Sequence, residues 1–218
     1  MRKVLFLILL MVNCQLSIVN VCAQPNKKAG LSLVKIATTK ADGTKIGETT
    51  GFAIPSPANQ GEVEIVSPYT IFKQAVKATV SDAKGKTTLA HRITGASDLY
   101  DVVRFTVDKA TMAPLPVATA KLDVGSKAYI LQPTGKGKTQ TIDVTIGEAP
   151  EQSGLTYYTI FRPSNDALTG CPLLNAKGEV VGVIQRGADN QADKTYAIGI
   201  EFNEALTVNT MSAADPAL

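Results

Sequence analysis

Residues 166–184 read DALTGCPLLNAKGEVVGVI, and the second half of this stretch has the pattern of a turn that leads into a β-strand. A polar turn signal, Ala176-Lys177-Gly178, precedes the short apolar run EVVGVI at 179–184. Glycine in a short polar connection favours a tight turn, and a β-branched run of this length favours an extended strand.

Runs of the same kind recur along the chain, and none is longer than about eight residues. From residue 24 onward Thr, Val and Ile make up 51 of 195 residues, which favours pleated sheet over helix. The runs lie at 31–37, 62–66, 102–107, 128–131, 141–146 and 196–200. Many short strands separated by turns predict an all-β sandwich or barrel. One short C-terminal helix is expected after Asn203, which would cap it.

The N-terminus has the three parts of a secretory signal peptide. Arg2 and Lys3 precede an apolar run at 4–12, and small residues up to Ala23 follow. Polar residues interrupt the run before it reaches the length of a membrane span. We therefore expect residues 1–23 to be removed, and an exported protein, periplasmic or extracellular and bacterial, without a membrane span.

The composition excludes several partners and sites. Twenty-two Lys and Arg stand against 19 Asp and Glu, with no basic block, so nucleic acid is not expected as a partner. A single histidine, His91, excludes multi-histidine metal sites. No pattern in the chain requires a metal or a cofactor.

The 166–184 stretch resembles the serine-nucleophile segment of trypsin-like proteases of the Deg/HtrA kind. Further segments resemble other parts of these proteases in the same order, at 47–54, 65–72, 97–107, 123–135 and 195–202. The resemblance implies two Greek-key barrels of six strands each, packed side by side. They would span residues 31–112 and 113–208, with a linker at 24–30 before them and a tail at 209–218 after them.

The same resemblance implies an altered catalytic centre. Asp101 matches the catalytic aspartate, whereas Thr70 occupies the place of the histidine and Thr169 that of the serine. Ala167 replaces the glycine whose backbone N–H, together with that of residue 169, would form the oxyanion hole. A threonine hydroxyl has no pKa near 7 and cannot take over the histidine's proton transfer. We therefore expect a protease homologue that does not cleave peptides but binds a peptide or protein ligand in the cleft between the barrels.

Two other residues with reactive side chains are expected to have structural roles. The resemblance implies that His91 lies on a strand that leads away from the cleft, so we expect a surface or half-packed histidine rather than a base beside Thr169. Cys171 has no Lys, Arg or His within three residues, so nothing nearby in sequence would lower its pKa, and we expect a packed small hydrophobic residue.

Two alternatives stay open at this stage. The chain would be an active serine- or threonine-type peptidase if an unexpected base activated Thr169. It would be a β-sandwich surface-binding module if the resemblance were accidental, in which case Thr70, Asp101 and Thr169 would lie far apart.

Overall fold

The computed structural model describes residues 27–108, 110–135, 137–187 and 192–206. The predicted signal peptide at 1–23 and the predicted tail at 209–218 lie outside these residues. The regular secondary structure of the described part of the chain is mostly β-strand, and this part contains no helix of seven residues or more. None of its helices is long and apolar enough to cross a membrane.

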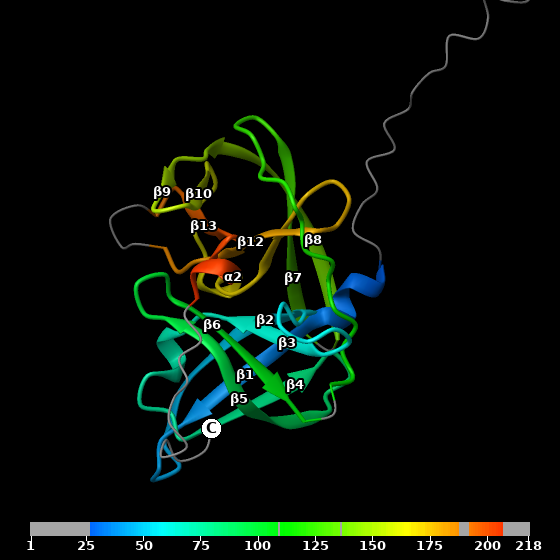
Figure 1. The fold of residues 1–218 in the computed structure, drawn as a ribbon, viewed down its shortest axis with the longest axis vertical. Helices are drawn as coiled ribbons and strands as arrows, with labels where there is room; N and C mark the ends of the chain where they lie inside the picture. Colours follow the sequence, from blue (N-terminus) through cyan, green and yellow to red (C-terminus); the bar gives the residue numbers. More distant parts are fainter. Residues whose placement is uncertain (1–26, 109, 136, 188–191, 207–218) are drawn as a thin grey trace, which may run out of the picture.

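The first six strands form a closed antiparallel barrel (Figure 1). Its strands are β1 (Leu33–Thr39), β2 (Lys45–Pro55), β3 (Val63–Ser67), β4 (Lys77–Asp82), β5 (Thr87–Ser97) and β6 (Val102–Val107). The pairing of β1 with β4 closes the barrel. A turn at Asp42-Gly43 joins β1 to β2, and Gly43 has a φ of +83° that suits glycine.

The second barrel contains β7 (Lys127–Gly135), β8 (Lys138–Glu148), β10 (Leu155–Ile160), β11 (Pro172–Leu174), β12 (Val180–Ile184) and β13 (Thr195–Gly199). The pairing of β10 with β13 closes it. A seventh short strand, β9 (Glu151–Gln152), pairs with β10 alone. Because both sheets close on themselves, the β-sandwich alternative is wrong, and the prediction of two six-stranded barrels is confirmed.

Successive residues of the same strand contribute to two different cores. Val34 and Ala53 point into the first barrel, whereas their neighbours Leu33 and Phe52 pack in a cluster shared with residues of the second barrel, such as Leu131. Side chains alternate between the faces of a strand, so these strands are buried on both faces. The apolar runs are therefore continuous at the junction of the two barrels.

Two short helices, one at each end of the described chain, differ from what the sequence predicts. Residues 27–30, expected as linker, belong to a 3₁₀ helix, η1 (Lys27–Ser32), so the first strand begins at Leu33 rather than at residue 31. The C-terminal helix, α2 (Phe202–Ala205), includes Asn203 in its first turn, and Glu201 precedes the helix. Asn203 therefore does not cap the helix; its side chain accepts a hydrogen bond from Arg104 instead.

Candidate functional site

Thr70 and Asp101 lie in contact at one end of the first barrel. Thr70 begins the 3₁₀ helix η2 (Thr70–Phe72) after β3, and Asp101 lies in the turn between β5 and β6. The Thr70 backbone N–H and the Thr70 hydroxyl both donate to Asp101 Oδ1, each at 2.6 Å. Asp101 has a φ of +47°, which is uncommon for a non-glycine residue and turns its carboxylate toward η2.

Thr169 lies where the second barrel meets the first. It follows the 3₁₀ helix η3 (Asp166–Leu168), and its carbonyl accepts a hydrogen bond from the Thr49 hydroxyl at 3.3 Å. The next residue, Gly170, lies so close to the first barrel that a Cβ there would be 2.0 Å from the Thr50 carbonyl oxygen and 2.9 Å from Pro68. Pro68 is two residues before Thr70. The fold therefore brings the segments that carry Thr70, Asp101 and Thr169 to one junction between the barrels.

Both backbone donors expected at the oxyanion position already have partners within their own turn. The Ala167 N–H donates to Asn165 Oδ1 at 2.9 Å, and the Thr169 N–H donates to the Asp166 carbonyl at 3.1 Å. An oxyanion hole requires donors directed at the reacting oxygen rather than at the protein itself. In this conformation the turn presents no such pair of free donors.

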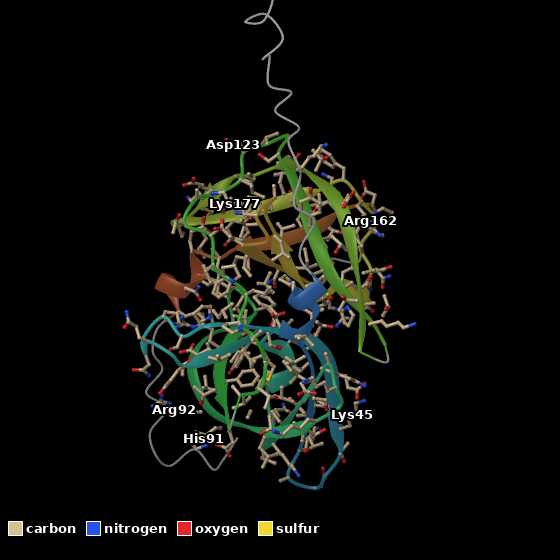
Figure 2. All side chains as sticks on the ribbon, turned by 90° about the vertical axis from the view of Figure 1, so that its right-hand side faces the viewer. Lys45, His91, Arg92, Asp123, Arg162 and Lys177 are labelled. Atoms are coloured by element: carbon tan, nitrogen blue, oxygen red, sulfur yellow. The ribbon has the colours of Figure 1, made fainter. Side chains whose placement is uncertain are left out.

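His91 lies at the end of the first barrel that is remote from the second barrel (Figure 2). Its ring Nδ1 is 3.7 Å from Asp108 Oδ1, and both side chains are 67% exposed. Since His91 is the only histidine of the chain, no imidazole is available to Thr70 or Thr169. The expected surface position of His91 agrees with the structure.

Lys73 is the amine that interacts with this site, because it follows η2 and forms an ion pair with Asp98. The hydrogen bond with Asp98, followed by the charges of Asp98 and Asp101, raises the pKa of Lys73. An amine that serves as a general base needs a lowered pKa. Lys73 therefore stays protonated at neutral pH and cannot accept the proton of a threonine hydroxyl.

Cys171 is fully buried in the core of the second barrel, next to Leu168 and Leu173. Burial raises the pKa of its thiol to about 12. The thiol is the protonated, packed group that the sequence predicts. Among the described residues, no group of three or more His, Cys, Asp or Glu side chains is placed to hold a metal ion.

A groove of about 1000 Å³ extends from this junction between the barrels. One wall is formed by Asp166 and Ala167 of η3 together with the β7–β8 hairpin, and the floor is formed by β1, β2 and the end of β4. The groove thus begins beside Ala167, two residues before Thr169, and leads away from it.

No family model matches the sequence, and no curated protein matches it. Solved structures do match. The Rv3671c protease of M. tuberculosis in its active form superposes with a TM-score of 0.68 at 22% identity, over 87% of this chain and 86% of that chain. Its inactive form gives a TM-score of 0.63 at 23% identity, over 82% and 88%.

The chain has a chymotrypsin-like fold. The serine endoprotease of Yersinia pestis shares this fold with a TM-score of 0.64 at 17% identity, over 82% of this chain and 62% of that chain. At sequence identities this low, the structural similarity shows a shared fold and nothing about function. The fold implied by the sequence resemblance is therefore confirmed, whereas the roles of Thr70, Asp101, Ala167 and Thr169 stay predictions.

Three features of this site could not be recognised, or were not recognised, from the sequence. Asn165 caps the turn that holds Ala167, and asparagine before a short helical turn is a signal that would have indicated it. The ion pair of Lys73 with Asp98 and the groove beside η3 depend on contacts between distant segments, for which no local sequence signal exists.

Proposed function

We propose that this protein is an exported protease homologue without peptidase activity, whose inter-barrel groove binds an extended peptide. The hydrogen bond from the Thr70 hydroxyl to Asp101 carries the proposal. Asp101 thereby holds a hydroxyl, which has no pKa near 7, at the position that the sequence resemblance assigns to the catalytic base.

The state of the turn at Ala167 and Thr169 supports the same conclusion. A tetrahedral intermediate on Thr169 would need backbone donors that are here bonded to Asn165 and Asp166. Loss of such donors and loss of a triad base each reduce catalysis by several orders of magnitude. Both requirements for acyl transfer are unmet in one site.

An active peptidase with an unusual centre is the second candidate, and Thr169 would be its nucleophile. Its base would have to be Lys73, since the single histidine lies at the remote end of the first barrel. The raised pKa of Lys73 argues against that role.

Binding and cleavage are tested together with carboxymethylated casein, an unfolded polypeptide. We expect the protein without residues 1–23 to retain casein and to release no fragments. Lys35→Trp should weaken this binding at least fivefold, because Lys35 lies on the groove floor. Lys45→Trp is the matched control, since Lys45 also pairs with Glu48 but does not line the groove. Casein fragments that disappear with Thr169→Ala would establish the peptidase, and absence of casein binding would refute the proposed function.

Export is tested by the mass of the protein secreted from a bacterial host. The N-terminal pattern of Arg2, Lys3 and the apolar run supports a mature chain that begins at Gln24. Recovery of the protein only inside the cell, with residues 1–23 attached, would contradict export.

A further inference from the structure

The floor of the groove crosses three strands of the first barrel at right angles. The strand register pairs Thr50 of β2 with Lys35 of β1, and Lys35 with Ser81 of β4. All three residues line the groove. Neighbouring strands lie about 4.8 Å apart, so the path from β2 to β4 is about 10 Å long and accommodates about three residues of an extended peptide.

The two barrels touch at the far end of this path. A Cβ on Gly137, in the β7–β8 hairpin, would be 2.3 Å from the carbonyl oxygen of Ala83, in the β4–β5 turn. Figure 2 shows this hairpin extending from the second barrel to the side of the first. A peptide that lies across the floor from the Thr169 end therefore reaches a closed end at the Gly137 and Ala83 contact.

Two lysines stand at this closed end. Lys84 follows Ala83 in the β4–β5 turn, Lys138 follows Gly137 in the hairpin, and both line the groove. Neither forms an ion pair within 4.0 Å with any residue that the structure describes. The closed end therefore presents two ammonium groups with no close carboxylate partner.

The acidic residues of the groove compensate only part of this charge, because one carboxylate, Asp82, lies at the closed end, where the charge of Lys84 acts on it. Glu48 is shared by Lys35 at 3.0 Å and Lys45 at 2.9 Å. Asp82 accepts hydrogen bonds from the backbone of Lys84 and Lys86, each at 2.9 Å, and from the Thr111 hydroxyl at 3.0 Å. Asp166 lies at the opposite end, next to Ala167.

We infer that the groove takes the last residues of a peptide chain, with the C-terminal carboxylate bound by Lys84 and Lys138. A closed end admits a chain terminus rather than a continuing chain, and the two ammonium groups repel an N-terminal amine. This inference rests on the proposed peptide-binding function and adds the part of the peptide that is recognised.

Selection from two displayed heptapeptide libraries tests the inference, one with free C-termini and one joined to its carrier through the C-terminus. We expect binders from the first library only. The best binder, resynthesised as the free acid, should bind at least about tenfold more tightly than its C-terminal amide, which lacks the charge that the lysines bind. Lys84→Ala and Lys138→Ala should each remove most of this preference.

Lys86→Ala is the matched control, because Lys86 lies in the same turn but does not line the groove, and it should leave binding unchanged. Equal affinity of the acid and the amide would overturn the carboxylate inference and leave the peptide-binding function standing. Failure of both libraries to yield a binder would refute the peptide-binding function itself. All three lysines are exposed, and unchanged thermal unfolding of the variants would establish that they fold.

Discussion

The identity of residue 70 determines what the hydrogen-bonded pair of Thr70 and Asp101 can do chemically. Asp101 accepts two hydrogen bonds from residue 70, one from its backbone and one from its hydroxyl. This arrangement orients the side chain well. An imidazole in this orientation could accept and return a proton near pH 7. A threonine hydroxyl, whose pKa is far from 7, keeps its proton and cannot act as a base. At the residue scale, Thr70 and Asp101 form an oriented hydrogen-bonded pair that contains no imidazole.

The buried thiol of Cys171 gives a prediction at the same scale. Because burial raises its pKa to about 12, the thiol should react with an aromatic disulfide reagent at pH 8 only after the protein is unfolded. In the unfolded protein the thiol loses its proton near pH 9, whereas in the folded protein it stays protonated up to about pH 12. Between these two pH values deprotonation stabilises only the unfolded state, so the free energy of unfolding should fall from pH 9 to 12. Cys171→Ala should show a smaller fall in urea titrations at pH 8 and 10. Rapid labelling of the folded protein at pH 8 would contradict the burial.

At the scale of the element, the turn from η3 into β11 fixes the relation between the two barrels. Gly170 has a φ of +80° and lies against the backbone of Thr50. Only a residue without a Cβ permits this approach. The position of Thr169 relative to the first barrel therefore depends on its neighbour, Gly170.

Gly170→Ala and Gly43→Ala separate this close approach from backbone strain. Both glycines have a φ near +80°, but a Cβ on Gly43 would have no atom within 4 Å. Gly43→Ala should cost about 1 kcal/mol of unfolding free energy, the cost of the left-handed conformation alone. Gly170→Ala should cost more than about 3 kcal/mol, since the Thr50 backbone must also move. Equal changes in urea unfolding would show that the contact with Thr50 does not matter.

The strands could be predicted from the sequence because each is a short β-branched run between turn signals. Residues 102–107 and 180–184 are observed as strands close to where the runs place them. The 3₁₀ helix at 27–32 could not be predicted, because residues 27–30 belong to no periodic pattern and residues 31–32 continue into the apolar run at 31–37. Gly30 packs against Thr139 of the distant β7–β8 hairpin. The groove could not be predicted, because its closed end depends on a contact between two turns far apart in sequence.

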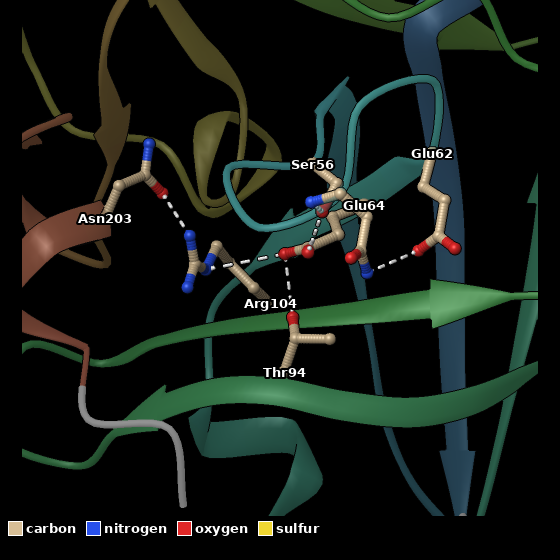
Figure 3. Close-up of polar contacts among 7 residues, drawn as sticks. Ser56, Glu62, Glu64, Thr94, Arg104 and Asn203 are labelled. Atoms are coloured by element: carbon tan, nitrogen blue, oxygen red, sulfur yellow. Dashed lines mark hydrogen bonds and ion pairs between the residues drawn. The ribbon is translucent and has the colours of Figure 1, made fainter.

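At the scale of the whole molecule, a buried polar cluster joins the first barrel to the C-terminal segment (Figure 3). Glu64 is 1% exposed and accepts hydrogen bonds from Ser56 at 2.6 Å and from Thr94 at 2.7 Å. Its carboxylate is 3.6 Å from Arg104 Nε, and Arg104 also donates to Asn203 of α2 at 3.2 Å. Burial lowers the pKa of Arg104, and the charge of Glu64 opposes this effect. The two charges therefore depend on each other.

Removal of Glu64 should be among the most destabilising single changes in the chain. Glu64→Ala leaves the guanidinium of Arg104 buried without its counter-charge, and we expect a loss of about 3–5 kcal/mol in unfolding free energy. Thr94→Ala removes one hydrogen bond to the same carboxylate and should cost about 1 kcal/mol. Denaturant unfolding measures both. Similar losses of unfolding free energy in the two variants would show that Glu64 does not stabilise the buried charge of Arg104.

Covalent labelling measures directly whether the Thr169 hydroxyl is activated as a nucleophile. The protein without residues 1–23 is incubated with a fluorophosphonate, and intact and peptide masses are recorded. We predict no adduct on Thr169, since the single histidine of the chain lies at the remote end of the first barrel and both turn donors are occupied. An adduct on Thr169 in the unmodified protein, absent in Thr169→Ala, would contradict the account and identify an active enzyme.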